Sequence, residues 1–287
     1  MQFRENFSSG LFSIGERGGK HPWFYHQHGM FVGRDPKATI SITTRGLSVT
    51  IPHYSLSGAG ADDHLKFVFW RNDVDRETGQ VGTKVPPHGM LTYEVRARAE
   101  ALGGASNPFA TPGSDYRLSC GAVLSIDRTT GIGCHFLLTA THAHAVYERY
   151  LLMDREKDPG AFFCYVIPVM EFPAGTDHTY RITYVQELNS ATWSLDGKVV
   201  TSIGNLGQRL GADQEQYSVF TDLPGSAATY LPPDHRIFGA GLLTLLDAGN
   251  RTGTGLVDLD RPDIPRQMKI FGQGGKMVIS EIQIGTE

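Results

Sequence analysis

Apolar and polar residues alternate strictly between residues 178 and 200, and this pattern predicts a series of β-strands. Residues 180–184 read YRITY, so the tyrosines and the isoleucine share one face while the arginine and the threonine share the other. This period of two residues is that of a half-buried strand. A second short strand ends at Asp196-Gly197, a dipeptide that favours the positive φ angles of a hairpin turn. Residues 198–200 then return as a third strand.

The same alternation, interrupted by turn residues, recurs along most of the chain. It is clear in residues 3–7 and in residues 277–284, and we expect these two terminal strands to pair. Helical periodicity is nearly absent, apart from a short turn expected within 208–216. Many short strands separated by turn residues predict an all-β fold, a two-sheet antiparallel β-sandwich. The other expected strands are residues 39–43, 47–51, 65–70, 90–100, 122–126, 133–150, 162–171 and 237–246.

Three segments are too long to be simple hairpin turns, namely residues 8–38, 101–119 and 247–266. Long ordered loops in compact domains are more often functional than idle. We therefore expect them to lie over the concave sheet of the sandwich. No Pro- or Ser-rich linker, charge block or internal repeat divides the chain, so residues 1–287 are predicted to form a single domain.

The composition agrees with a folded protein and narrows its partners. The chain has 287 residues, of which 40% are hydrophobic, and a net charge of −4. This charge provides no basic surface for nucleic acid or for an anionic membrane. No apolar run reaches the roughly 18 residues of a membrane-spanning helix, and the N-terminus lacks a secretory signal, so we expect a cytoplasmic protein. Cys120, Cys134 and Cys164 are predicted to be reduced, buried thiols.

Two segments carry a resemblance to a known class of sandwich. Residues 91–98, LTYEVRAR, are similar to the "yG.fEvRaK" strand of β-glucanases. Residues 178–200, in which Trp193 precedes Asp196-Gly197, are similar to the "HtYrI…W.vDG..v" pattern. Both patterns belong to the concanavalin A-like lectin and glucanase class, which implies a concanavalin A-like jelly roll. Further segments resemble an uncharacterised bacterial family within that class, for which the resemblance implies no activity; they are residues 146–150, 178–182 and 238–248.

The chain departs from the glucanases where their catalytic groups lie. Retaining members carry two catalytic carboxylates in an E-x-D-x-x-E strand, which places them about 5–5.5 Å apart across the scissile bond. The strand that follows residues 91–98 reads LSIDR at 124–128 and contains no glutamate. A glucanase mechanism of this type is therefore not expected.

A histidine-rich strand offers different chemistry. Residues 139–148 read TATHAHAVYE, and on a strand His142, His144 and Glu148 face the same side. Two imidazoles, a carboxylate and the nearby Tyr150 are groups that exchange protons near neutral pH. The alternative is that both histidines are ordinary polar residues on the solvent face of an antiparallel sheet.

The same histidines, together with residues 173–178, resemble the two cupin motifs, H-x-H-x3-E and P-x-G-x2-H. That resemblance implies a divalent metal held by the four side chains His142, His144, Glu148 and His178. The glycines that flank the cupin motifs are missing, and Ile182 stands in place of their closing asparagine. His178 also belongs to the sandwich pattern. We therefore expect no cofactor and keep the cupin-like metal site as an alternative.

Additional substrate contacts are expected from one strand and one loop. On the EvRaK-like strand, Arg96 and Arg98 are suited to hold a carboxylate or to polarise a carbonyl. The alternative is that they form cross-strand ion pairs on a solvent face. Tyr93 of the same strand is a further expected contact. Trp23 and Tyr25, expected in a loop, are the aromatic residues predicted to touch a ligand.

Together these features predict a cofactor-independent enzyme of the lyase, isomerase or cyclase type, acting on a small apolar metabolite in secondary-metabolite biosynthesis. His142 or His144 would be the acid–base group, and Glu148 would orient an imidazole or act as the base. Tyr150 would donate to a developing oxyanion, and Arg96 would anchor a polar end of the substrate. Two alternatives stay open: a carbohydrate-binding module or glycoside-active enzyme, and a metal-dependent cupin-like enzyme. The expected partner is a small molecule or a glycan.

Overall fold

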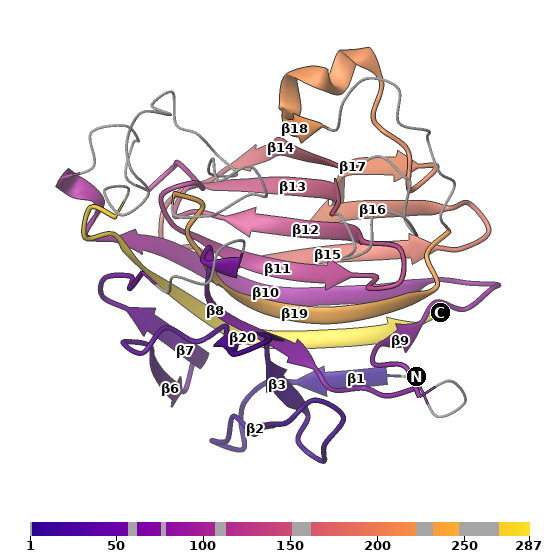
Figure 1. The fold of residues 1–287 in the computed structure, drawn as a ribbon. Helices are drawn as coiled ribbons and strands as arrows, with labels where there is room; N and C mark the ends of the chain where they lie inside the picture. The colour runs from indigo at the N-terminus through magenta and orange to yellow at the C-terminus, as the bar shows by residue number, and fades with distance from the viewer. Residues whose placement is uncertain are drawn as a thin grey trace.

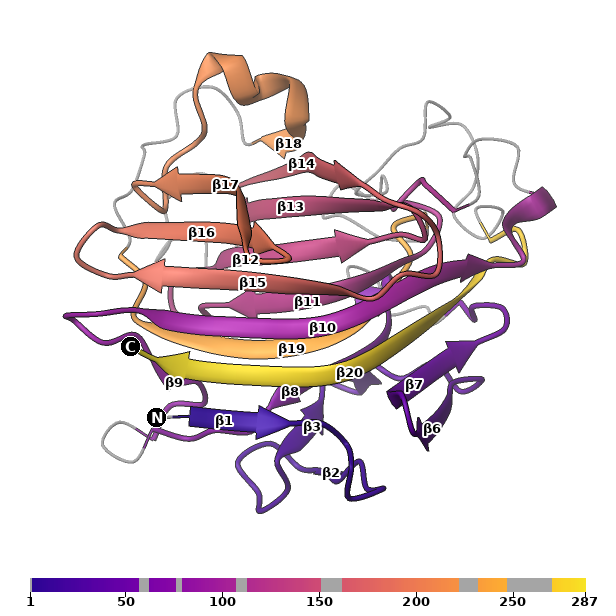
Figure 2. The ribbon, with the colours of Figure 1, turned by 180° about the vertical axis from the view of Figure 1, so that it is seen from behind.

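The computed structural model describes residues 2–56, 62–75, 79–106, 113–150, 162–221, 232–246 and 270–287. These residues form two large β-sheets that face each other, as Figures 1 and 2 show from opposite sides. Within them, the helical segments are two short 3-10 turns, η2 (Gly104–Ser106) and η3 (Ala212–Tyr217). None of the described helices is long and apolar enough to cross a membrane. The predicted all-β sandwich of jelly-roll type is confirmed.

We call the two sheets A and B. Sheet A has the order β17 (Lys198–Gly204), β16 (Ser190–Leu195), β15 (His178–Val185), β10 (Leu91–Leu102), β20 (Gly274–Thr286), β7 (Gly46–Ile51) and β6 (Thr39–Thr43), and β1 (Gln2–Glu5) also pairs with β20. The pairing of β1 with β20 confirms the predicted contact of the terminal strands. Sheet B has the order β18 (Ser218–Thr221), β14 (Phe163–Glu171), β13 (His142–Arg149), β12 (Ile132–Leu138), β11 (Cys120–Ile126), β19 (His235–Leu243), β8 (Leu65–Arg71), β3 (Trp23–Tyr25) and β2 (Ile14–Gly15). Two smaller pairings are β9 (Thr83–Lys84) with β19, and β4 (Gln27–His28) with β5 (Phe31–Val32).

The core lies between the sheets and follows from the alternation of side chains along each strand. In β10, Tyr93 and Val95 are fully buried while Arg96 is exposed on the other face. Tyr93 stacks on Phe238 of sheet B with ring centroids 4.6 Å apart. Burial of each such side chain stabilises the fold by about 1.5–3 kcal/mol. The hydrophobic effect therefore holds the two sheets face to face.

A hydrogen bond links His178, the first residue of β15, to the turn between β16 and β17. Asp196 has a positive φ of 50° in the turn between β16 and β17. Its carboxylate accepts hydrogen bonds from His178 Nδ1 at 2.7 Å and from the Thr179 backbone at 2.9 Å. His178 is thus part of the framework of the sandwich.

The outer face of sheet B carries a second apolar layer, which the alternation did not predict. Leu124 of β11, Leu137 of β12 and Val146 of β13 point away from the core, yet they are 6%, 5% and 3% exposed. Val68 and Trp70 of β8 belong to the same layer. Polar groups on this face consequently lie in a poorly hydrated environment, where electrostatic interactions are stronger than in water.

Two predicted segments are corrected by the structure. The expected strand 133–150 is two strands, β12 and β13, because a turn in which Thr139 N donates to His142 O reverses the chain. Trp23 and Tyr25 do not lie in a loop; they belong to β3, which lies between β8 and the edge strand β2 in sheet B. Of the long loops expected over the sandwich, 247–266 lies outside the described residues.

Candidate acid–base site

The outer face of sheet B brings His135 of β12 and Glu148 of β13 together. His135 Nε2 lies 2.9 Å from Glu148 Oε1. The residue opposite Glu148 in the strand register is Gly133. A Cβ atom at Gly133 would lie 2.5 Å from His135 Nε2 and 2.8 Å from Glu148 Cγ, too close for either to stay in place. The glycine therefore leaves the space in which the two side chains meet.

The hydrogen bonds of His135 fix its tautomer. Ser125 N donates to His135 Nδ1 at 3.1 Å. Nδ1 therefore carries no proton, and the proton on Nε2 is donated to Glu148. The imidazole is neutral in this arrangement. Its backbone is held as well, because Trp193 Nε1 of sheet A donates to the His135 carbonyl at 2.8 Å.

Glu148 is both ionised and accessible. Burial is the largest influence and by itself raises the pKa of this carboxyl group, but the hydrogen bonds from His135 and Cys164 and the electrostatic effect of His135 and His64 together outweigh it, so the pKa of Glu148 is lowered from its ordinary value. The surrounding protein desolvates the carboxylate, yet 24% of its side-chain surface is open to solvent. Glu148 is therefore a desolvated carboxylate that a solvent molecule or a ligand can still reach.

Two protonated groups border Glu148. Tyr150, half-buried directly after β13, has its pKa raised by burial; the charge of Arg128 acts in the opposite direction and that of Glu148 adds to the rise. Cys164, opposite Glu148 on β14, hydrogen-bonds to the carboxylate, and burial together with the Glu148 charge raises the pKa of its thiol. Tyr150 therefore stays protonated at neutral pH, and Cys164 stays a thiol rather than the thiolate that acts as a nucleophile. All three cysteines are free and buried, as predicted.

His142 and His144 share the outer face with Glu148, as the alternation predicted, but they lie near the other end of β13. Their rings stack with centroids 6.2 Å apart, and His144 also packs against Tyr116. Burial, and then the charge of His142, lowers the pKa of His144 to about 4. At about 3.3 Å per residue, His142 is roughly 20 Å and His144 roughly 13 Å from Glu148 along the strand. The imidazole that Glu148 holds is therefore His135, not either of these histidines.

The two predicted arginines lie on the wrong side of the sandwich for this site. Arg96 and Arg98 are on the outer face of sheet A, whereas Glu148 is on the outer face of sheet B. Arg98 forms an ion pair with Asp177 at 2.6 Å. The structure therefore does not bring Arg96 beside the histidine strand, where it was predicted to anchor a substrate. Strand alternation identifies the face of a sheet but not which sheet the strand joins.

The three predicted aromatic contacts are turned toward the core. Tyr93 and Trp23 are 0% and 1% exposed, so neither has surface to offer a substrate. The Tyr93 hydroxyl donates to the carbonyl of Gly239 at 2.7 Å. Tyr25 is half-buried and packs edge-on against Phe67. These side chains are used to fill the sandwich, which corrects their expected role in binding.

The cupin-like set of ligands is not brought together. His178 lies on sheet A, bonded to Asp196, while His142, His144 and Glu148 lie on sheet B. Throughout the described ranges, no group of three or more His, Cys, Asp or Glu side chains is placed to hold a metal ion. The four residues therefore do not fit a cupin metal centre.

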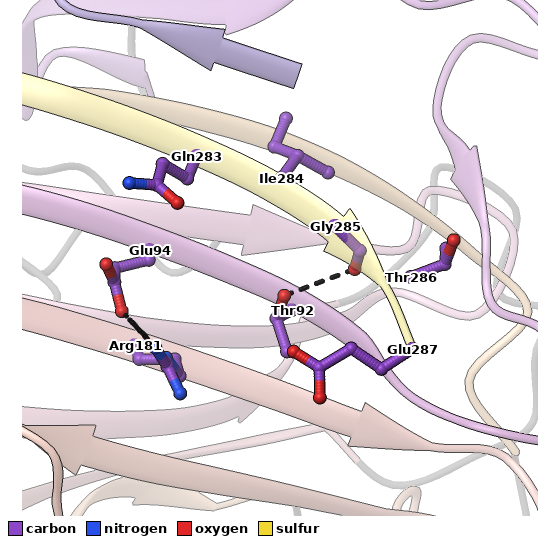
Figure 3. A pocket seen from close by; sticks show the side chains of 8 residues that line it. All are labelled: Thr92, Glu94, Arg181, Gln283, Ile284, Gly285, Thr286 and Glu287. Carbon is purple, nitrogen blue, oxygen red and sulfur yellow. Dashed lines mark hydrogen bonds and ion pairs between the residues drawn. The ribbon is translucent and has the colours of Figure 1, made fainter. Parts of the chain in front are cut away.

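A polar groove of about 370 Å³ lies on the outer face of sheet A (Figure 3). Glu94 and Arg181, opposite each other on β10 and β15, form an ion pair at 2.7 Å. Thr92 Oγ1 donates to the Gly285 carbonyl at 3.2 Å, and Gln283 also lines the groove. The groove thus presents solvent-facing hydrogen-bonding groups rather than a desolvated acid–base pair.

Gly133 and His135 were not among the residues predicted from the sequence. The turn at 139–141 is the sequence feature that could have identified them, because a hairpin centred there places Gly133 opposite Glu148. Without that turn, residues 133–150 appear as one strand and the two partners appear far apart.

Replacement of Gly133 by alanine tests the space between His135 and Glu148. We expect Gly133→Ala to displace one of the two side chains and to lower the free energy of unfolding by about 1–3 kcal/mol, because the added methyl overpacks the site. Urea unfolding measures this change. Gly204→Ala, on β17 with no atom within 4 Å of the added Cβ, is the matched control. Equal stability of the two variants would contradict the crowding described here.

The lowered pKa of His144 predicts a pH dependence of stability. The unfolded chain takes up the proton near pH 6.5 and the folded chain only near pH 4. Between these values the unfolded state binds more protons, so stability falls as the pH falls, by up to about 3 kcal/mol. We expect His144→Gln to reduce this slope in unfolding measurements from pH 7 to pH 4. His53→Gln, at an exposed position after β7, is the control; an unchanged slope in His144→Gln would refute the assignment.

Comparison with solved structures supports the fold. An apo Crh5 transglycosylase has a TM-score of 0.50 and 12% sequence identity, over 99% of this chain and 83% of that chain. The Crh5 transglycosylase in complex with NAG has the same TM-score and coverage at 13% identity. A Bacillus licheniformis β-glucanase has a TM-score of 0.46 and 12% identity, over 100% of this chain and 98% of that chain. At these identities the likeness concerns the sandwich alone.

No curated protein matches the chain. The model of one family, described as a family of unknown function (DUF6081), matches residues 4–287. The chain therefore belongs to this family of unknown function, DUF6081.

Proposed function

We propose that this protein is a carbohydrate-active enzyme that works by acid–base chemistry on the outer face of sheet B. Glu148 is the proton acceptor and Tyr150 the proton donor, and His135 positions Glu148. The observation that carries the proposal is the state of Glu148: a carboxylate that is desolvated, hydrogen-bonded to the His135 imidazole, lowered in pKa by its neighbours, and still open to solvent.

The choice of carbohydrate over a small apolar metabolite is supported by the structural neighbours. The sandwich is similar to a transglycosylase that has been seen in complex with NAG. The sequence-based expectation of an apolar metabolite has no comparable support. We therefore place the glycoside-active alternative ahead of it.

The arrangement of carboxylates favours proton transfer over glycoside hydrolysis by two carboxylates. Hydrolases of that kind hold the pair about 5–5.5 Å apart when retaining and about 6.5–9.5 Å apart when inverting. On strands β11 to β14, the other outward-facing carboxylate is Glu171, paired with His142 in the strand register. It is roughly 20 Å from Glu148 along the sheet. A lyase-type reaction needs only a base and an acid, which Glu148 and Tyr150 provide.

The protonation states agree with these roles. The lowered pKa of Glu148 keeps it ionised at neutral pH and so able to accept a proton, and the raised pKa of Tyr150 keeps its hydroxyl protonated and so able to hydrogen-bond to the leaving oxygen. In an elimination, the base removes a proton from carbon, the electron pair forms the double bond, and the acid protonates the leaving oxygen. His135 does not exchange a proton in this scheme, because its Nδ1 accepts from the backbone of Ser125.

A non-catalytic carbohydrate-binding protein is the second candidate. The groove on sheet A favours it, because paired charged and amide side chains such as Glu94, Arg181 and Gln283 present hydrogen-bond donors and acceptors side by side (Figure 3). Reversible binding of a glycan without turnover would support this candidate.

The proposal is tested on a panel of neutral and acidic polysaccharides, with assays for reducing ends and for the ultraviolet absorbance of unsaturated products. We expect unsaturated products from the unmodified protein and a loss of kcat of about 100-fold or more in Glu148→Gln and in Tyr150→Phe. Glu100→Gln, on the outer face of sheet A, is the matched control and is expected to keep full activity.

Full activity in both Glu148→Gln and Tyr150→Phe would refute these roles. Reducing ends without unsaturated product would retain the carbohydrate substrate but reject the elimination. Absence of any turnover on the panel would leave the binding protein as the better description.

A further inference from the structure

Two loops that carry arginines lie at the same end of the sheet B strands as Glu148. Strands β8 and β11 both run antiparallel to β19, which lies between them. Their C-terminal ends are therefore at the same end of the strands of sheet B. Two strand spacings separate those ends by about 10 Å. Ile126, at the end of β11, pairs with Gly133, and Gly133 pairs with Glu148. Glu148 therefore lies at the end of the strands where both loops are found.

The first loop, residues 16–21, is fixed to Asn72 just after β8. The Asn72 side-chain amide donates to the carbonyls of Glu16, Gly19 and His21 at 2.9–3.2 Å. Its oxygen accepts from Gly18 N at 2.7 Å. One buried side chain thus organises the backbone on both sides of Arg17. The loop presents Arg17 in a defined position although its sequence is rich in glycine.

The second loop, residues 127–131, is a turn held by Asp127. The Asp127 carboxylate accepts from the Thr129 backbone at 2.8 Å and from its hydroxyl at 2.6 Å. The turn is joined to the proposed acid, because Tyr150 N donates to the Gly131 carbonyl at 3.1 Å. Arg128 and Thr129 are the exposed residues of this turn.

The charge of Arg128 acts on Arg17 and on Tyr150 beside the candidate site. Burial, and then the charge of Arg128, lowers the pKa of Arg17. The Arg128 charge also acts on Tyr150 and on His26, whose ring packs against Trp70 of the apolar layer. Neither Arg17 nor Arg128 forms an ion pair with a carboxylate in the described part of the chain. Two like charges that act on each other, neither of them paired with a carboxylate among the described residues, favour an anionic ligand between them.

We infer that Arg17 and Arg128 form a clamp for an anionic group of the substrate, a carboxylate or a sulfate, so that the substrate is an acidic saccharide; this inference rests on the proposed function of Glu148 and Tyr150. Guanidinium groups suit this task because their planar donors match the oxygens of such anions in pairs. The clamp lies at the end of sheet B where the turn 127–131 is bonded to Tyr150. An acidic group bound there places the neighbouring sugar atoms over Glu148.

Binding measurements in the Glu148→Gln background separate the clamp from turnover. The probes are hexamers of galacturonate, mannuronate and glucuronate, the methyl ester of each, and a sulfated galactan hexamer, studied by isothermal titration calorimetry. We expect at least one acidic hexamer to bind, and its neutral ester to bind at least about tenfold more weakly. Arg17→Gln and Arg128→Gln should each weaken the acidic ligand about tenfold and leave the ester unchanged. Binding of a uronate identifies carboxylate as the anion, and binding of the galactan identifies sulfate.

Arg45→Gln, in the exposed turn between β6 and β7, is the matched control for loss of one positive charge. The clamp is overturned if no acidic hexamer binds, if the acid and its ester bind equally, or if the Arg17 and Arg128 variants bind as the control does. Acid-selective binding without turnover by the unmodified protein would keep the clamp and reject the proposed enzyme. Turnover of a neutral glycan that depends on Glu148 but not on the arginines would keep the enzyme and reject the clamp.

Discussion

The hydrogen bond between His135 and Glu148 is the interaction on which the candidate site depends. It exists because Gly133 leaves room between two neighbouring strands, and because Ser125 N occupies the other nitrogen of the imidazole. Trp193 of the opposite sheet holds the His135 carbonyl, so the packing of the core is connected directly to the position of the ring. A change in any of these three contacts would alter the hydrogen bond that Glu148 accepts from His135 and therefore the pKa of its carboxyl group.

The two outer faces of the sandwich differ in a way that explains why the chemistry is assigned to sheet B. On sheet A, charged side chains such as Glu94 and Arg181 pair in solvent, where ion pairs contribute little. On sheet B, Leu124, Leu137 and Val146 exclude water from the polar groups among them. Glu148 therefore interacts more strongly with its neighbours on sheet B than a carboxylate on sheet A does, and its pKa is lowered by His135, His64 and Cys164.

Strand alternation was sufficient to predict the sandwich, the pairing of the terminal strands and the common face of His142, His144 and Glu148. It was not sufficient to predict which sheet each strand joins, so Arg96 was placed beside groups that lie across the sandwich from it. It also did not reveal the turn at 139–141, and without the register of that hairpin Gly133 and Glu148 were not recognised as neighbours. The second apolar layer was missed for a related reason: β12 has apolar residues on both faces, which the alternation rule treats as an exception.

The measurement that tests this account most directly is the tautomeric state of His135, determined by ¹⁵N NMR of the histidine side chains at neutral pH. The structure predicts a neutral ring with the proton on Nε2 and none on Nδ1. A ring protonated on Nδ1, alone or in the imidazolium form, would mean that Nδ1 does not accept from Ser125. Glu148 would then not be held as described, and the acid–base site would lose its basis.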